Sequence, residues 1–448
     1  MHRKIKVALV GGGSYAWAPT LYSTFFYNDF FDKDLELCLY DINEKALNDL
    51  YNYLSHYNNE YPDKAITLTK TLSEDKALEG ADYVAIAISH GGTDAEMQDH
   101  IITRKHGFYN VKGSESGIAG ASRTIRSVPE FVRIARKMKK LCKPNVTLMN
   151  VTNPLTALTR CVQKYEDVHA IGFCHGIINH LRILLPYFGA TNFDDVSFSV
   201  SGVDHCSFLT DVKFKDQDAL EIMRKKGMIE AAWAGKTDIT YDDPFAGREN
   251  QRIRFILWDM LGCMPGLSDE HCAEFYYQTT GTQANRDRFG MDYDRLADRQ
   301  KTIQRIKSKV TTVLESQQFP ELKVGGEIIH RVIEAFEGGR KYKDVCNYRN
   351  LGQVRELPHD IVVETFNTFD ATGVHPIIAN PLPKQALQIV APTAYREELF
   401  IEAAMEWDAG KLTAALCADP LVQDFTRIRD VVKELMDYNA QFLPKGMI

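Results

Sequence analysis

The sequence lacks the long apolar runs and the excess of positive charge that mark two large classes of protein. No segment of the 448 residues comes near the roughly 18–20 apolar residues that a membrane-spanning helix needs. The net charge of −7 gives no field that would attract nucleic acid or an anionic membrane. We therefore expect neither nucleic acid nor a membrane as a partner.

Paired cysteines are absent as well. The nine cysteines are odd in number, widely scattered and form no Cys-x-x-Cys pair. A disulfide scaffold and a structural zinc site both need close or regular pairing, so the pattern disfavours both. Buried reduced thiols are typical of cytoplasmic proteins, and we expect a cytoplasmic location.

What the sequence does contain is an alternation of strands and helices over its first half. Such alternation is typical of a parallel sheet with crossover helices. Asn43 to Asn59 is the clearest helix, since Asn43 can cap it and apolar residues recur at helical spacing. The predicted strands are Ile5–Val10, Leu35–Tyr40, Ile66–Lys70, Tyr83–Ile88, Val146–Asn150 and Ala170–Phe173.

The second half has a different pattern. After the strand-like run Val196–Val203 come long segments with helical character, such as Lys301–Gln317 and Glu327–Phe336. We expect an α/β fold, with a Rossmann-type doubly wound parallel sheet in residues 1–195 and an α+β domain in residues 196–448. No low-complexity linker separates the two halves, so we expect them to share an interface.

A glycine turn follows the first predicted strand. Gly11 to Ala16 fits the pattern G-x-G-x-x-A, between a strand and a helical stretch, where backbone N–H groups can bind a pyrophosphate. Asp41 ends the next strand, where its carboxylate favours NAD over NADP by repelling a 2′-phosphate. A purely structural turn is the alternative. The expected dinucleotide contacts are Gly11, Gly12, Gly13, Ser14, Asp41 and Asn150.

Polar residues end later strands of the same sheet. Asn153 is kept extended by Pro154, so its carboxamide can meet a sugar hydroxyl or a nicotinamide, although an Asx-type turn is equally compatible. Cys174 and His205 each end a predicted strand. If those strands are neighbours, the thiolate and the imidazole can bind a divalent metal, and packing roles are the alternative.

A further candidate is Ser268–His271, in a stretch flanked by proline and glycine. It can be a loop of the site or a helix cap, in which case Ser268 or Asp269 needs no catalytic role.

Together these segments resemble glycoside hydrolase family 4, a family that depends on NAD rather than on two carboxylates. The resemblance runs from the first strand to beyond residue 376 and rests on the order of its motifs. The matching segments are Gly11–Ser14, Gly113–Glu130, Asn150–Pro154, Cys174–Gly176, Gly202–His205, Ser268–Phe275 and Leu357–Pro376.

The resemblance implies the metal and the substrate class. The family's metal ligands fall on Cys174 and His205, which would hold Mn²⁺ or another divalent ion. The triplet Cys174-His175-Gly176 is similar to the α-glucuronidase type, which implies an α-linked uronic acid as substrate. Phosphosugar members tend to carry an arginine where this chain has Glu96, whose charge would repel a sugar phosphate.

The resemblance also implies a mechanism: oxidation at C3 of the sugar, removal of the C2 proton, elimination of the glycosidic oxygen, addition of water and reduction at C3. Asp269 is then the expected base, and His175 the expected acid or a substrate ligand. Asn153 and His271 are expected to bind substrate as well. We expect a homo-oligomer, either a dimer or a tetramer.

Other functions remain open at this point. Within the family, an α-galacturonidase, an α-galactosidase or an α-glucosidase is the alternative. Outside it, a malate- or lactate-type dehydrogenase shares the expected fold and the strand-end Asn-Pro, but its Gly-Glu-x-His-Gly-Asp-Ser-like motif is missing. A cofactor-binding regulator without catalysis would need no Cys/His pair.

Overall fold

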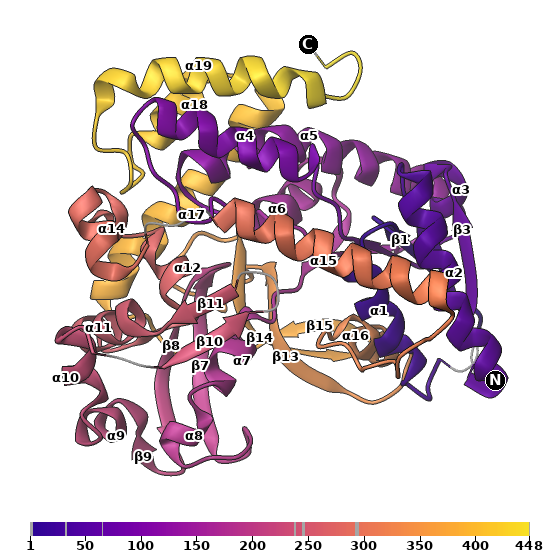
Figure 1. Cartoon of the computed structure of the whole chain (residues 1–448), viewed down its shortest axis with the longest axis horizontal. Coiled ribbons are helices and arrows are strands. Elements are labelled where there is room, and N and C mark those ends of the chain that lie inside the picture. Colours follow the sequence, from indigo (N-terminus) through magenta and orange to yellow (C-terminus); the bar gives the residue numbers. More distant parts are fainter. Residues whose placement is uncertain are drawn as a thin grey trace.

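A nine-stranded sheet forms the centre of the computed structural model, which describes residues 3–31, 34–64, 66–236, 239–243, 247–291 and 295–447 (Figure 1). Six parallel strands follow the order β3-β2-β1-β4-β5-β6, and β13, β14 and β15 extend the β6 edge in antiparallel fashion. The strands are β1 (Ile5–Val10), β2 (Leu35–Tyr40), β3 (Thr67–Thr71), β4 (Tyr83–Ile86), β5 (Thr147–Asn150), β6 (His169–Gly172), β13 (Tyr342–Arg349), β14 (Val362–Asp370) and β15 (Gly373–Pro376).

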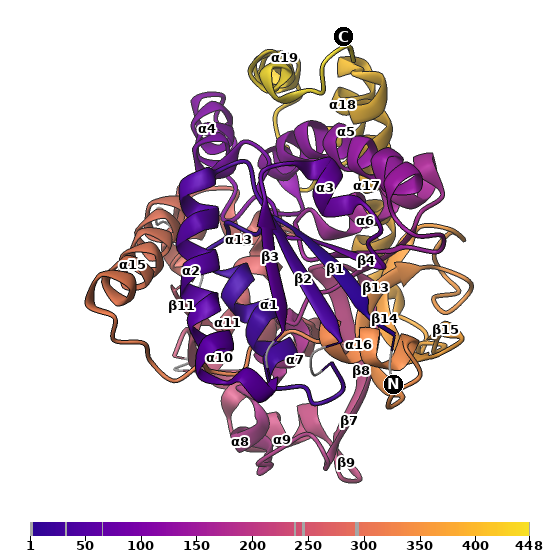
Figure 2. The same ribbon diagram turned by 90° about the vertical axis from the view of Figure 1, so that its right-hand side faces the viewer.

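Helices cover both faces of this sheet, which confirms the doubly wound architecture (Figure 2). One face packs against α1 (Trp17–Phe26), α2 (Glu44–Glu60), α15 (Arg295–Ser316) and α16 (Ile329–Phe336). The other packs against α3 (Glu74–Leu78), α4 (Gly92–Lys105), α5 (Gly117–Leu141), α6 (Leu155–Glu166), α17 (Lys384–Glu406), α18 (Ala409–Leu416) and α19 (Ile428–Asn439).

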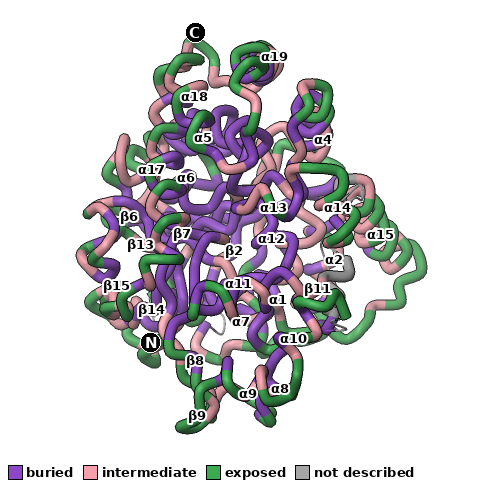
Figure 3. Tube along the Cα trace, turned by 90° about the vertical axis from the view of Figure 1, so that its left-hand side faces the viewer, coloured by how far each residue is buried: buried purple, intermediate pink, exposed green. Residues whose placement is uncertain are grey.

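The core lies between these layers, and outer helices such as α15 are exposed or half-buried over most of their length (Figure 3). Central strands are buried on both faces because helices cover each face; β4, for example, is buried at all four positions. The predicted strands agree with the observed ones to within two residues at each end. Asn43 caps α2 as predicted, its side chain accepting a hydrogen bond from the Ala46 N–H at 3.1 Å.

A smaller sheet from the second half stands beside β14. It contains β7 (Val196–Val203), β8 (Cys206–Phe214), β9 (Gln217–Asp218) and β12 (Met264–Pro265), and a separate hairpin pairs β10 (Thr240–Asp243) with β11 (Gly247–Asn250). Short helices surround it: α7 (Gly176–Arg182), α8 (Leu185–Phe188), α9 (Ala219–Lys225), α10 (Met228–Trp233), α11 (Arg252–Leu261), α12 (Asp269–Ala273), α13 (Tyr277–Thr280) and α14 (Gln283–Phe289).

The two halves of the sequence are interleaved in space. The second half adds β13–β15 to the main sheet, and α17–α19 complete the core on one of its faces. The boundary between residues 195 and 196 therefore stays a prediction, although the expected contact between the halves is extensive. None of the helices in the described part of the chain is long and apolar enough to cross a bilayer.

Candidate active site

The glycine turn after β1 is shaped by contacts that exclude side chains. Gly11 has φ +100°, and a Cβ at this position would lie 2.3 Å from the carbonyl oxygen of Ala87. The Gly13 N–H donates to Oδ2 of Asp41 at 2.8 Å, and a Cβ on Gly13 would lie 2.7 Å from the same oxygen. The turn is therefore packed so closely against its neighbours that Gly11 and Gly13 leave no room for a Cβ.

Asp41 is held beside this turn. Its Oδ1 accepts a hydrogen bond from the Asn43 N–H at 2.8 Å, while Oδ2 accepts the bond from Gly13. Each carboxylate oxygen has a second lone pair, so Asp41 can still accept hydrogen bonds from ribose hydroxyls. Ser14 accepts a hydrogen bond from the Trp17 N–H at 3.2 Å and so helps to begin α1.

The loop after β5 is fixed from within. Asn150 is fully buried, and its amide donates to the Thr152 carbonyl at 3.1 Å and to the Thr159 hydroxyl at 3.2 Å. Its oxygen accepts the Thr152 N–H at 2.8 Å. The observed contacts of Asn150 are thus structural, and direct contact with a dinucleotide stays a prediction. Asn153 is half-buried at the strand end, before a cis bond to Pro154.

Cys174, Asp204 and His205 form a compact cluster of possible metal ligands. One ligand atom from each lies within 4.8 Å of the others, and Oδ2 of Asp204 is 3.3 Å from Nε2 of His205. Bonds of about 2.0–2.2 Å to a divalent ion place neighbouring octahedral ligand atoms roughly 3 Å apart. The Asp204–His205 spacing therefore fits two adjacent positions around one ion.

The route by which the cluster assembles differs from the predicted one. Cys174 follows β6 in the main sheet, whereas His205 follows β7 in the smaller sheet, so the two strands are not neighbours. Asn347 of β13 connects them: it pairs with Gly172 of β6 and donates to Oδ1 of Asp204 at 3.1 Å. The condition that the two strands are neighbours is not met, yet the two residues do meet.

His205 occupies a strained position in the turn between β7 and β8. Val203 pairs with Cys206, so Asp204 and His205 make a two-residue turn, and His205 has φ +62°. The Asp204 N–H donates to the Thr156 hydroxyl at 3.0 Å. A histidine in the left-handed region is uncommon, and such strain is concentrated at functional sites.

Electrostatics in the cluster favour a cation. Burial raises the pKa of Asp204 to about 7, although Asn347 and Cys174 donate to it. Burial, then the nearby Asp204 and Glu364, raise the pKa of Cys174 well above its ordinary value. Burial lowers the pKa of His205 and keeps it neutral. A divalent ion would stabilise both anions and would accept the neutral imidazole as a ligand.

His175 lies next to this cluster and pairs with Glu327 from the loop before α16. Its Nδ1 is 3.2 Å from Oε2 of Glu327. Burial alone would lower the pKa of His175, but the Glu327 carboxylate outweighs burial and raises it. The imidazole can therefore carry a proton beside the cluster.

The segment Ser268–His271 divides into two kinds of residue. His271 faces the cluster: its ring centroid is 4.5 Å from that of His205, and Nζ of Lys112 lies 3.0 Å from its Nε2. Asp269 is fully buried at the start of α12, and its Oδ1 accepts the Arg254 N–H at 2.9 Å, in the first turn of α11. Asp269 thus caps α11, and not α12, the helix to which it belongs.

Glu96 is not the isolated negative charge that the sequence suggested. Arg123 NH2 lies 3.0 Å from its Oε1 and Arg299 NH1 lies 3.5 Å from its Oε2. Repulsion of a sugar phosphate by Glu96 alone is therefore not supported, because two guanidinium groups compensate its charge.

Several polar residues of the site were missed by the sequence reasoning. Asp204 could have been found, since it directly precedes His205. Asn347 and Glu364 are polar residues inside buried strands, which is a weaker signal. Nothing in the local sequence singles out Lys112 or Glu327. The missed residues are Lys112, Asp204, Glu327, Asn347 and Glu364.

Known proteins resemble this chain over nearly all of its length. A model described as family 4 glycosyl hydrolase matches residues 6–185, and the model of its C-terminal domain matches residues 200–422. An α-galacturonidase from Thermoanaerobacterium saccharolyticum is 26% identical over 457 residues, 98% of this chain and 96% of the relative.

Two solved structures share the fold. One from Bacillus subtilis, described as a glucosidase, has 25% identity and a TM-score of 0.85, and the match covers 97% of this chain and 100% of that one. The other is a 6-phospho-β-glucosidase from Thermotoga maritima with manganese, NAD⁺ and glucose-6-phosphate. It has 22% identity and a TM-score of 0.78, with 99% and 100% covered.

Proposed function

Because the chain belongs to family 4 of the glycosyl hydrolases, we propose that it hydrolyses α-linked hexuronic acid glycosides, with an α-galacturonide as the preferred substrate. Family membership makes the protein a glycosidase and removes the dehydrogenase and the regulator as alternatives. The name of the α-galacturonidase relative supports the galacturonide. An α-glucuronide is the second candidate, favoured by the triplet Cys174-His175-Gly176.

The observation that carries the proposal is the Cys174–Asp204–His205 cluster at the carboxyl edge of the sheet. Parallel α/β sheets bind ligands at this edge. A thiol, a carboxyl and a neutral imidazole suit Mn²⁺ or a similar ion, and the closely packed glycine turn beside Asp41, at the start of a helix, suits NAD. The related Thermotoga maritima structure holds both groups, which supports the same pair here.

When bound, the two groups supply reversible hydride acceptance at C3 and polarisation of the sugar's hydroxyl oxygens. Gly11, Gly12, Gly13, Ser14 and Asp41 would hold the dinucleotide, and Cys174 and His205, with Asp204 facing them, would hold the metal.

The remaining steps fall to side chains around the cluster. His175, whose proton is stabilised by Glu327, would protonate the leaving glycosidic oxygen or bind the sugar. His271 and Asn153 would orient the sugar. Asp269 is proposed as the base at C2, and the hydrogen bond from the Arg254 N–H to its Oδ1 holds the carboxylate in place at the start of α12.

A panel of four nitrophenyl α-glycosides tests the proposal: galacturonide, glucuronide, galactoside and glucoside, each with NAD⁺, Mn²⁺ and a thiol reductant. We expect the highest kcat/KM for the galacturonide. A preference for the glucuronide would select the second candidate, and a preference for a neutral hexoside would overturn the uronide assignment. The cytoplasmic location and the homo-oligomer stay predictions.

A further inference from the structure

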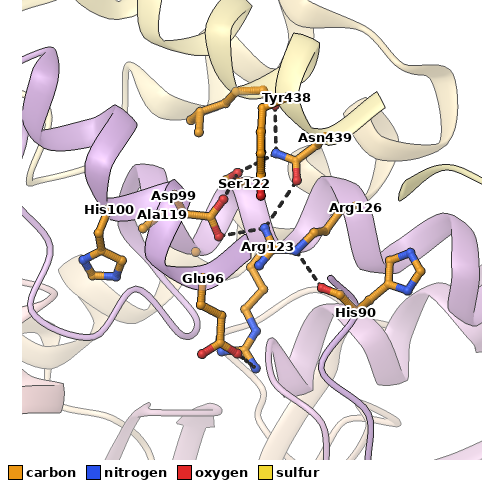
Figure 4. A network of polar contacts seen from close by, with 12 residues as sticks. His90, Glu96, Asp99, His100, Ala119, Ser122, Arg123, Arg126, Tyr438 and Asn439 are labelled. Atoms are coloured by element: carbon orange, nitrogen blue, oxygen red, sulfur yellow. Dashed lines mark hydrogen bonds and ion pairs between the residues drawn. The ribbon is translucent and has the colours of Figure 1, made fainter. Parts of the chain in front are cut away.

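An arginine-rich network lies where α4, α5 and α19 meet (Figure 4). Arg126 of α5 is fully buried; its Nε donates to the His90 carbonyl at 2.8 Å and its NH1 donates to Asp99 at 2.7 Å. Asp99 also accepts the Ser122 hydroxyl at 2.6 Å, and Asn439 of α19 donates to Ser122 at 2.7 Å. Arg126 and Asp99 thus form a buried ion pair anchored by neighbours.

Arg123, on the same helix, is partnered far less completely. Its side chain is 8% exposed and points to Glu96 (Figure 4), with NH2 3.0 Å from Oε1. Within the described residues, the guanidinium of Arg123 forms this ion pair and no directional hydrogen bond. A guanidinium has five N–H donors. Those that the ion pair with Glu96 leaves unused can donate to a ligand with acceptor oxygens.

Glu96 forms ion pairs with two arginines, Arg123 and Arg299. Arg299 of α15 approaches its other oxygen at 3.5 Å and is 40% exposed. Burial would raise the pKa of Glu96, but Arg123, Arg299 and the Ser89 hydroxyl together lower it to about 2, so the carboxylate is ionised. The Glu96 carboxylate neutralises one of the two guanidinium charges. The three side chains together therefore carry a net charge of +1.

The network lies at the carboxyl edge of the main sheet. The Ser89 hydroxyl donates to Oε1 of Glu96 at 2.7 Å, and Ser89 follows the carboxyl end of β4. The Ile88 N–H, one residue earlier, donates to the Thr152 hydroxyl at 3.0 Å, in the loop that carries Asn153. Glu96 and its two arginines therefore approach the loop that is proposed to bind the sugar.

We propose that Arg123 and Arg299, positioned by Glu96, bind the carboxylate of the substrate's sugar and make the enzyme select uronides over neutral hexosides. The inference rests on the proposed function and deepens it. A carboxylate offers two oxygens to a guanidinium fork and carries a single charge, which the net +1 balances. A phosphate carries about −1.5 to −2 and would be left undercompensated.

The test compares Arg299→Gln with Arg305→Gln, a matched control on the exposed side of the same helix. Each holoenzyme is assayed on nitrophenyl α-galacturonide, α-galactoside and 6-phospho-α-glucoside. Charge-assisted hydrogen bonds imply that Arg299→Gln lowers kcat/KM for the galacturonide about 10- to 100-fold. The galactoside rate should stay within about 3-fold, and Arg305→Gln should change neither. Arg123→Lys keeps the charge but loses the fork, and should also act selectively on the galacturonide.

Equal losses on the charged and neutral substrates, or no loss on either, would overturn the inference. If the wild type hydrolyses no galacturonide, the proposed function fails, and calorimetric binding of galacturonate and galactose to the holoprotein decides separately on the arginines. Selective weakening of galacturonate by Arg299→Gln supports them, and unchanged binding refutes them. NAD⁺ affinity is measured alongside, because its loss would assign the arginines to the dinucleotide phosphates. Loss confined to the phosphosugar would assign them to a phosphate.

Discussion

Replacing Cys174 by serine should remove metal binding while sparing the dinucleotide site. The hydroxyl stays protonated, so the ion loses both a donor and a negative charge. A unit charge about 2.3 Å from a divalent ion contributes about 14 kcal/mol at an effective dielectric constant of 20. Dehydration of the ion and of the thiolate offsets most of this. If one fifth of the Coulomb energy remains after this offset, the binding free energy of Mn²⁺ falls by about 3 kcal/mol, and Mn²⁺ binds roughly 100-fold more weakly.

Free Mn²⁺ measured by electron paramagnetic resonance gives the affinity, and calorimetry gives the NAD⁺ affinity of the same samples. Cys272→Ser is the matched control: Cys272 is buried on α12, and its thiol donates to the Leu267 carbonyl at 3.2 Å. It should bind Mn²⁺ as the wild type does. Unchanged Mn²⁺ affinity in Cys174→Ser would refute the assignment of the metal site, as would an equal loss in both variants.

Three further changes probe the base, the support of the metal site and the glycine turn. Asp269→Asn should slow hydrogen exchange at C2 of the sugar at least 100-fold with little change in KM, because the amide keeps the shape but cannot take the proton; normal exchange, followed by NMR, would return Asp269 to capping α11. Asn347→Leu removes the hydrogen bond to Asp204 and should weaken Mn²⁺ binding about 10- to 100-fold. Unchanged Mn²⁺ affinity in the electron paramagnetic resonance titration would show that Asp204 does not support the metal. Gly13→Ala forces a Cβ to within 2.7 Å of Asp41 and should weaken NAD⁺ binding at least 10-fold with Mn²⁺ binding retained; calorimetry showing full NAD⁺ affinity would argue for a purely structural turn.

Local patterns predicted the parts of the fold that depend on local physics. The strand–glycine–helix sequence around Gly11 and the cap at Asn43 are set by neighbouring residues, and the structure has both. The ends of α15 and α16 were less predictable. The helix expected to begin at Lys301 begins at Arg295. The helix expected to begin at Glu327 begins at Ile329, because Glu327 belongs to the loop before α16 and pairs there with His175.

The site depended on contacts that sequence spacing does not encode. Cys174 and His205 meet across two sheets, through Asn347 on a strand more than 140 residues away from both His205 and Cys174 in the chain. The ion pair between Glu96 and Arg299 was not predicted, because Arg299 comes from a helix of the other half. Such long-range ion pairs follow from the packing of α15 against α4, which the periodicity of either helix leaves open.

Hydrolysis of nitrophenyl α-galacturonide in D₂O, with NAD⁺ and Mn²⁺ present, tests the central claim most directly. Product sugar is examined by NMR for deuterium at C2, and absorbance at the reduced-nicotinamide band is followed during turnover. The account predicts deuterium at C2 of the released galacturonate, an absolute requirement for NAD⁺ and no net accumulation of NADH. Product without deuterium at C2, formed at the same rate when NAD⁺ is absent, would contradict it.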